Sequence, residues 1–230
     1  MTFQKNLSTF YKSNYYSFIS IMNVSSYSAS FTAGSLLYKE TTALLPLLLS
    51  DNSGLLIKEE IKQNNLLKIN SEKARERTVS EIQKRLSFVD HYFWEYYSER
   101  QEKEQKLMLF YLCMKTYKLM FDYHFNVTVR QWNSSNPVIE PFLYQMELNE
   151  ISGKVDLVYN WTNSTKEKTI SVYIRILKDI ELLNTRTLRL KSVTIEGDFW
   201  NYFIKQRELW FLDACLLNPI TKKNIMDSAL

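Results

Sequence analysis

The stretch NWTNSTKEKTISVYIRILKDIELLNTRTLRLKSVTI, residues 160–195, decides the fold class that the sequence predicts. Ser164 and Glu167 have the spacing of a capping box, in which the serine hydroxyl and the glutamate carboxylate satisfy the first free amides of a helix. Apolar residues then recur at the helical period, and after Asn184 apolar and basic residues partly alternate, as they do in a strand. The sequence therefore predicts a capped helix followed by a short β-hairpin, the order found in the second half of a winged helix.

Positive charge is concentrated in the same stretch. It holds seven basic and three acidic side chains, a net charge of +4 that equals the formal charge of the whole chain. Lys and Arg neutralise phosphates, so the stretch is expected to meet a nucleic-acid backbone. The expected contacts are Thr165, Lys166, Lys168, Thr169, Arg175, Arg186, Arg189 and Lys191. Basic surface residues can also serve solubility alone, and this alternative stays open.

A second basic stretch, NNLLKINSEKARERTVSEIQKRLSFV, covers residues 64–89. Asn70 or Ser71 can cap a longer helix that follows a short one, which gives a helix-turn-helix outline. The expected nucleic-acid contacts here are Lys73, Arg75, Arg77, Lys84 and Arg85. A solvated helix face carrying ion pairs spaced four residues apart, such as Glu81 with Arg85, explains the same pattern equally well.

Length and composition predict a mainly α protein. The 230 residues include only four glycines and four prolines, too few for a turn-rich β protein. The expected organisation is a loosely ordered leader (1–26), a helical N-terminal domain (27–132), a linker (133–141), a winged-helix-like C-terminal domain (142–217) and a tail (218–230). The leader lacks the long apolar centre and cleavage site of a secretory signal.

The sequence shows no arrangement of residues typical of catalysis. His91 and His124 have no partner at metal-ligand spacing, and neither a glycine-rich phosphate loop nor G-x-S-x-G occurs. A non-enzyme is expected, with no cofactor, no metal and no small-molecule substrate. Cys113 and Cys215 lie in apolar patterns, which indicates packing residues in a reducing cytoplasm. No apolar run has the length of a membrane span.

Four segments resemble the BrxA family, a component of the BREX phage-defence systems of bacteria and archaea. They are SFTAGSLLYKE (30–40), NNLLKINSEKARERTVSEIQKRL (64–86), ERQEKEQKLMLFYLCMKTY (99–117) and WTNSTKEKT (161–169). The resemblance implies a mostly helical protein, similar in part to the RNA-binding factor NusB, that binds double-stranded DNA and has no known catalytic residues. The family's basic character maps onto Arg75, Arg77, Lys84, Arg85, Lys166, Lys168 and Arg175.

Three functions follow as hypotheses. The first is a cytoplasmic, non-catalytic component of a BREX complex that binds double-stranded DNA mainly through phosphates. The second is an adaptor, in which the aromatic segment 198–217 or the polar segment 99–106 docks another BREX protein. The third is RNA binding by analogy with NusB, which rests on fold likeness alone.

Overall fold

The structure is a computed structural model that describes residues 27–195 and 197–228. The predicted leader therefore lies outside the described residues. The chain divides into two compact units. We call Ser30–Thr116 the N-terminal unit; the C-terminal unit consists of Tyr117–Leu230 and takes in the described residues before Ser30. The predicted linker, residues 133–141, lies inside the C-terminal unit.

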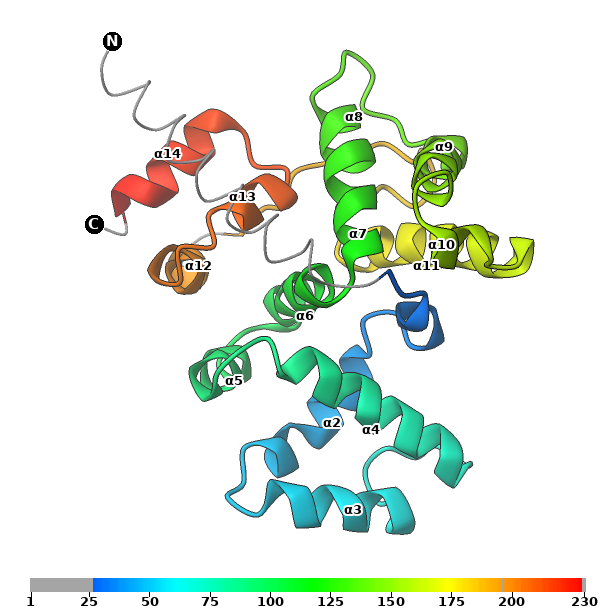
Figure 1. The fold of residues 1–230 in the computed structure, drawn as a ribbon. Coiled ribbons are helices and arrows are strands. Elements are labelled where there is room, and N and C mark those ends of the chain that lie inside the picture. The colour runs from blue at the N-terminus through cyan, green and yellow to red at the C-terminus, as the bar shows by residue number, and fades with distance from the viewer. Residues whose placement is uncertain (1–26, 196, 229–230) are drawn as a thin grey trace. The chain divides into compact units, whose positions relative to one another are not determined.

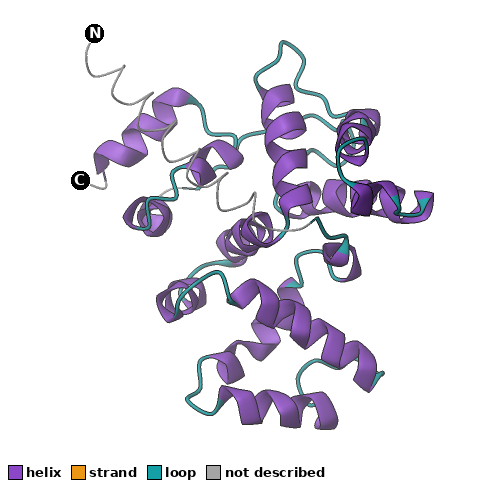
Figure 2. Cartoon of the chain, in the orientation of Figure 1, coloured by secondary structure: helices purple, strands orange, loops and turns teal. Residues whose placement is uncertain are grey.

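Every regular element of the described chain is a helix, which confirms the mainly α prediction (Figure 1 and Figure 2). The N-terminal unit contains η1 (Ser30–Ala33), α2 (Tyr38–Leu48), α3 (Ser53–Gln63), α4 (Glu72–Leu86), α5 (His91–Ser98) and α6 (Glu102–Thr116). The C-terminal unit contains α7 (Lys118–Asp122), η2 (Tyr123–Val129), α8 (Arg130–Trp132), α9 (Pro141–Ser152), α10 (Asp156–Tyr159), α11 (Asn163–Asp179), η3 (Gly197–Trp200), α12 (Asn201–Lys205), α13 (Trp210–Ala214) and α14 (Pro219–Ser228).

The core of the N-terminal unit forms where α2, α3 and α4 meet. Each of these helices contributes apolar residues from one face, as amphipathic helices do. The buried cluster consists of Leu37, Leu44, Ile57, Leu67, Val79 and Ile82. At the far end of the unit, α5 and α6 bury an aromatic group that includes Phe93, Tyr97 and Tyr111. The core therefore fixes α4 with one face inward and the other in solvent.

Two buried charged residues hold the loop between α3 and α4. The Glu60 carboxylate accepts hydrogen bonds from the amides of Asn65, Leu66 and Leu67 at 2.8–3.1 Å. From the other side, the Arg75 guanidinium donates to the main-chain oxygens of Ile61, Lys62, Ile69 and Asn70. Buried main-chain groups need hydrogen-bond partners, and the loop has no helix or strand to supply them. These two side chains provide the partners instead.

The predicted winged helix and its β-hairpin are wrong, because the described residues contain no strand. After α11 the chain forms only isolated antiparallel bridges, one between Leu183 and Leu190 and one between Val138 and Arg189. Leu188 has a left-handed backbone (φ 53°), which interrupts the extended conformation that the alternating pattern suggested. Residues 188–191 instead run between two other segments of the chain. Their main-chain groups form hydrogen bonds with residues 182–184 on one side and with residues 137–139 on the other.

The cap of α11 lies two residues before the predicted one. Thr162 has an extended backbone, and its Oγ1 accepts a hydrogen bond from the Thr165 amide at 3.2 Å. Ser164 is already inside the first turn, so the predicted Ser164–Glu167 capping box does not form. The sequence W-T-N-S-T offers several capping residues in a row, and the helix begins at the earliest of them that has extended geometry.

Replacing Thr162 by alanine is expected to lower the free energy of unfolding by about 1 kcal/mol, because the helix loses its capping acceptor. Ser164→Ala, two residues later, should change it by less than about 0.5 kcal/mol. Urea denaturation followed by circular dichroism compares the two variants. A larger effect at Ser164 would show that the capping box forms in solution.

Candidate nucleic-acid interface

The basic residues expected on α4 divide into two groups. Arg75 and Arg85 are buried, with 5% and 2% of their surface exposed, so they are placed in the fold and not at a surface. Arg75 holds the loop described above, while Arg85 donates to the Leu36 oxygen and pairs with Glu81 at 3.4 Å. Burying a guanidinium requires such partners, and here main-chain oxygens supply most of them.

The other three, Lys73, Arg77 and Lys84, are exposed. Spacings of four and seven residues place them on one face of α4, opposite the face that carries Val79 and Ile82. The Lys84 Nζ reaches the Ser30 hydroxyl at 3.5 Å. We call Lys73, Arg77 and Lys84 the α4 stripe.

On α11 the structure also separates the expected contacts. Thr169 is fully buried, where its hydroxyl bonds to the Tyr123 hydroxyl and to the Lys166 oxygen. The Lys166 ammonium donates a hydrogen bond to the main-chain oxygen of Tyr159 at 3.1 Å and lies over the Tyr159 ring. Thr165 belongs to the helix cap, where its hydroxyl contacts that of Thr162 at 2.9 Å.

Lys168 and Arg175 remain exposed on α11. They lie seven residues apart, which is two turns, so both project from the same face of this 17-residue helix. The opposite face is buried and includes Ile170, Tyr173 and Leu177. The side of α11 that faces solvent thus carries two cations, beside the exposed carboxylates of Glu167 and Asp179.

Residues 184–191, which we call the basic loop, carry the remaining contacts, and Arg186, Arg189 and Lys191 are all exposed. The Asn184 side-chain oxygen accepts the amides of Arg186 and Thr187, both at 3.0 Å, which folds the tip into a tight turn. Main-chain bonds at both ends, such as Asn184 to Arg189 at 2.9 Å, hold its base. Lys191 faces Glu181 at 3.7 Å, so its charge is partly balanced.

The histidines and cysteines of the described residues do not gather into a metal-binding group. Within the described ranges, no three His, Cys, Asp or Glu side chains gather where they could hold a metal ion. His91 is exposed beside Glu95, whereas His124 is fully buried. Both cysteines are buried and free. No described helix is long and apolar enough to cross a membrane.

Two of the comparisons with known proteins name the same family. The BrxA family model matches residues 25–207. A relative described as "BREX protein BrxA", from Paramagnetospirillum magneticum, is 24% identical over 187 residues, which cover 81% of this chain and 94% of the relative. The crystal structure of an uncharacterized protein from Magnetospirillum magneticum has a TM-score of 0.68 at 24% identity, covering 82% of this chain and 97% of that one. This likeness shows a shared fold.

Proposed function

Because the chain belongs to the BrxA family, we propose that it is a non-catalytic component of a BREX phage-defence complex that binds double-stranded DNA through its phosphates. The observation that carries the proposal is the set of exposed basic side chains on ordered elements. This set comprises Lys73, Arg77, Lys84, Lys168, Arg175, Arg186 and Arg189. Cations on a rigid scaffold neutralise phosphates without a large cost of ordering the chain.

The proposed contacts favour the duplex backbone over base reading. The basic loop and the α4 stripe present Lys and Arg, which bind phosphate oxygens in any sequence. Base discrimination commonly uses Asn, Gln or Arg placed in pairs against base edges, and the exposed set is spread over separate elements. We therefore infer an affinity with little dependence on sequence and a strong dependence on salt.

Neutralising Arg186 and Arg189 together, as Gln, is expected to weaken duplex binding about tenfold at low salt. Each phosphate contact that is lost should also reduce the slope of log affinity against log salt by about one. Gel shifts or fluorescence anisotropy with two unrelated duplexes, at several salt concentrations, measure both quantities. The double variant Lys168→Gln/Arg175→Gln tests α11 in the same way, and Lys73→Gln/Arg77→Gln tests α4.

The matched control is Lys205→Gln/Lys223→Gln, which removes two exposed positive charges from α12 and α14. If charge alone mattered, this control would weaken binding as much as the loop variant does. An unchanged affinity and salt slope in all three test variants would remove these surfaces from the proposal. Competition between equal lengths of duplex DNA and structured RNA tests the NusB-like alternative, which a clear preference for RNA would favour.

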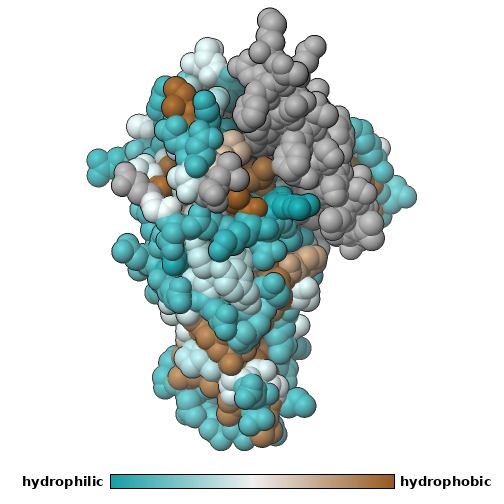
Figure 3. Space-filling view, turned by 90° about the vertical axis from the view of Figure 1, so that its left-hand side faces the viewer, coloured by the Kyte–Doolittle hydropathy of each residue, from teal (hydrophilic) through white to brown (hydrophobic). Residues whose placement is uncertain are grey.

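An adaptor function is the second candidate; the polar segment 99–106 stays an expected docking surface, and α9 offers a further one. The aromatic segment 198–217 is buried, since Phe199, Trp200 and Phe211 are each at most 2% exposed. On α9, by contrast, Phe142 and Met146 are 64% and 49% exposed and one turn apart. Apolar surface also lies between hydrophilic side chains on the N-terminal unit, in the lower part of Figure 3. Exposed apolar residues of this size favour contact with another BREX protein.

A further inference from the structure

A pocket of about 410 Å³ opens between η2 and α9 of the C-terminal unit. Its volume lies within the range of small-molecule sites, roughly 300–1,000 Å³. One wall is η2, a seven-residue π-helix, a rare conformation that is often found at functional sites. The other wall is the end of α9 and the turn that follows it.

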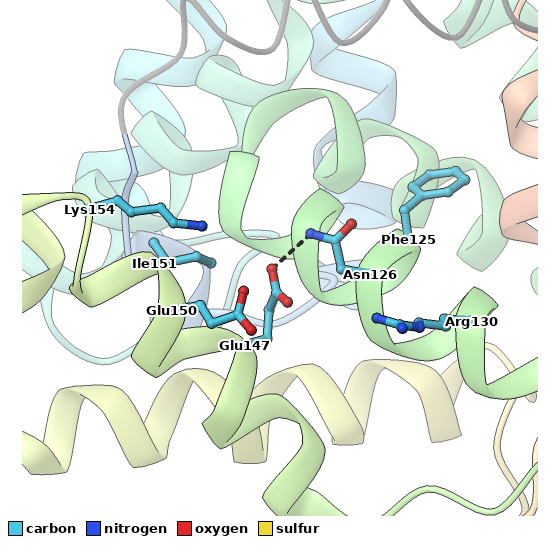
Figure 4. Close-up of a pocket in the computed structure, with 7 residues that line it drawn as sticks. All are labelled: Phe125, Asn126, Arg130, Glu147, Glu150, Ile151 and Lys154. Carbon is cyan, nitrogen blue, oxygen red and sulfur yellow. Dashed lines mark hydrogen bonds between the residues drawn. The ribbon is translucent and has the colours of Figure 1, made fainter.

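The residues that line the pocket differ in charge and polarity between its middle and its two sides. Figure 4 shows Asn126, Glu147 and Glu150 in the middle, with the two carboxylates side by side. Ile151 and Lys154 lie on one side, and Phe125 and Arg130 lie on the other. Each side of the pocket thus offers one cation, Phe125 adds a half-buried ring on the Arg130 side, and the centre offers acceptors.

These charged groups do not pair with one another at salt-bridge distance. Among the described residues, Arg130, Glu147, Glu150 and Lys154 form no salt bridge, although all four line one pocket. The Glu147 Oε1 accepts one hydrogen bond, from the Asn126 amide at 2.7 Å. Charged groups that converge without pairing are arranged for a ligand that carries groups of both kinds.

The environment of Glu147 supports this view. Partial burial is the main cause that raises the pKa of this carboxyl group, and the nearby carboxylates of Asp122 and Glu150 raise it further. The Asn126 hydrogen bond and the Lys154 charge act in the opposite direction. A carboxylate that has lost part of its hydration gains from any donor placed against it.

We propose that this pocket binds a guanine nucleotide, with the base edge on Glu147 and the phosphate on Arg130 or Lys154. A carboxylate can only accept hydrogen bonds, so it pairs best with two adjacent donors. Guanine has such a pair in its N1–H and N2–H₂ groups. Adenine and cytosine offer a single amino group on that edge, and uracil places acceptors on both sides of its one donor. The half-buried ring of Phe125 gives the base one apolar surface to lie against.

The same chemistry could come from a free nucleotide or from an unpaired guanine in a single strand. Both carry the donor edge and a phosphate, and both satisfy the carboxylates and the cations together. A plain ammonium ligand would satisfy only the carboxylates and would lie next to two like charges. The proposal is independent of duplex binding, because none of the exposed cations assigned to the duplex lines this pocket.

Isothermal titration of the full chain with guanosine, adenosine, cytidine and uridine monophosphates tests the proposal. We expect the guanine nucleotide to bind at least about tenfold more tightly than the other three, and Glu147→Gln to abolish that preference. Glu140→Gln is the matched control, since it removes an exposed carboxylate at the start of α9 outside the pocket. Thermal melting of each variant establishes that it is folded.

A second arm uses Lys154→Gln and Arg130→Gln, which change exposed residues. At least one of them should weaken the guanine nucleotide about tenfold and leave guanosine, which lacks the phosphate, unchanged. A short single strand with one guanine distinguishes the two sources by binding more tightly or less tightly than the free nucleotide. Equal binding of all four nucleotides, no binding, or tighter binding of a simple diamine would overturn the proposal. Loss of duplex affinity in Glu147→Gln would instead mean that the pocket belongs to the duplex site.

Discussion

Replacing Arg75 by methionine is expected to destabilise the N-terminal unit by about 3–5 kcal/mol. The buried guanidinium donates to the oxygens of Ile61, Lys62, Ile69 and Asn70, on both sides of the α3–α4 loop. Methionine keeps an apolar stem of similar length but leaves these acceptors without their donor, and each buried acceptor that loses its partner costs about 1–3 kcal/mol. Part of the loss is recovered where water reaches the loop.

Denaturation followed by tryptophan fluorescence can separate the two units. Trp94 is the one tryptophan of the N-terminal unit, and it is buried, whereas the other four belong to the C-terminal unit. The control is Arg77→Met, two residues further on the exposed face of the same helix, which should change stability by less than about 0.5 kcal/mol. Identical unfolding curves for the Arg75 and Arg77 variants would show that the guanidinium does not hold the loop.

The case of Arg75 explains why the α4 contacts could be predicted only in part. The sequence K-A-R-E-R, residues 73–77, predicts a basic helix, and these residues do lie in α4. Which arginines point inward depends on where the preceding loop leaves its carbonyl oxygens, and that is set by the tertiary fold. Lys73 and Arg77 lie on the exposed face, while Arg75 and Arg85 do not.

The C-terminal unit shows the same limit for secondary structure. The helical period over 163–179 predicted α11 well, because the buried face of an amphipathic helix consists of apolar residues that recur at helical spacing in the sequence. The alternation in 186–195 suggested a strand pair, but alternation reports only which side chains are buried. Leu190 and Val193 are buried against neighbouring segments of the chain, without a hairpin.

The pocket beside η2 had no signal in the sequence. Its residues come from two segments, around 125–130 and 147–154, and neither segment carries a motif. The region from Tyr92 to Phe125 reads as one apolar helical pattern, yet the structure breaks it at Glu99–Gln101 and again at Tyr117. Neither the breaks nor a π-helix can be read from apolar periodicity, because the period continues across them.

Behind the pocket, the buried face of η2 is held by a chain of hydrogen bonds whose directions can be assigned. The His124 Nε2 lies 2.8 Å from the Ala214 oxygen, which can only accept, so this nitrogen carries the proton. The Nδ1 then accepts from the Tyr173 hydroxyl at 2.7 Å. That hydroxyl accepts from Thr128 at 3.0 Å, and Thr128 accepts from the Tyr144 hydroxyl at 2.8 Å. These directions are those of a neutral imidazole, the form that the lowered pKa of His124 favours.

Acidification is therefore expected to destabilise the C-terminal unit through His124. Burial lowers the pKa of this imidazole to about 3, although its hydrogen bond to Ala214 acts in the opposite direction. In the unfolded chain the pKa returns to about 6.5, so between these values the unfolded state binds the extra proton. The free energy of unfolding should fall by up to about 1.4 kcal/mol for each pH unit as the pH drops from 6.5 towards 3.

His124→Gln, which cannot titrate, should start from a lower stability at pH 7.5 and show a shallower loss on acidification. Urea denaturation at pH 7.5, 6, 5 and 4 compares the two proteins, with His91→Gln as the control for an exposed histidine. Parallel curves for the wild type and His124→Gln would mean that the imidazole binds its proton equally well in the folded and unfolded chains, which would contradict the lowered pKa.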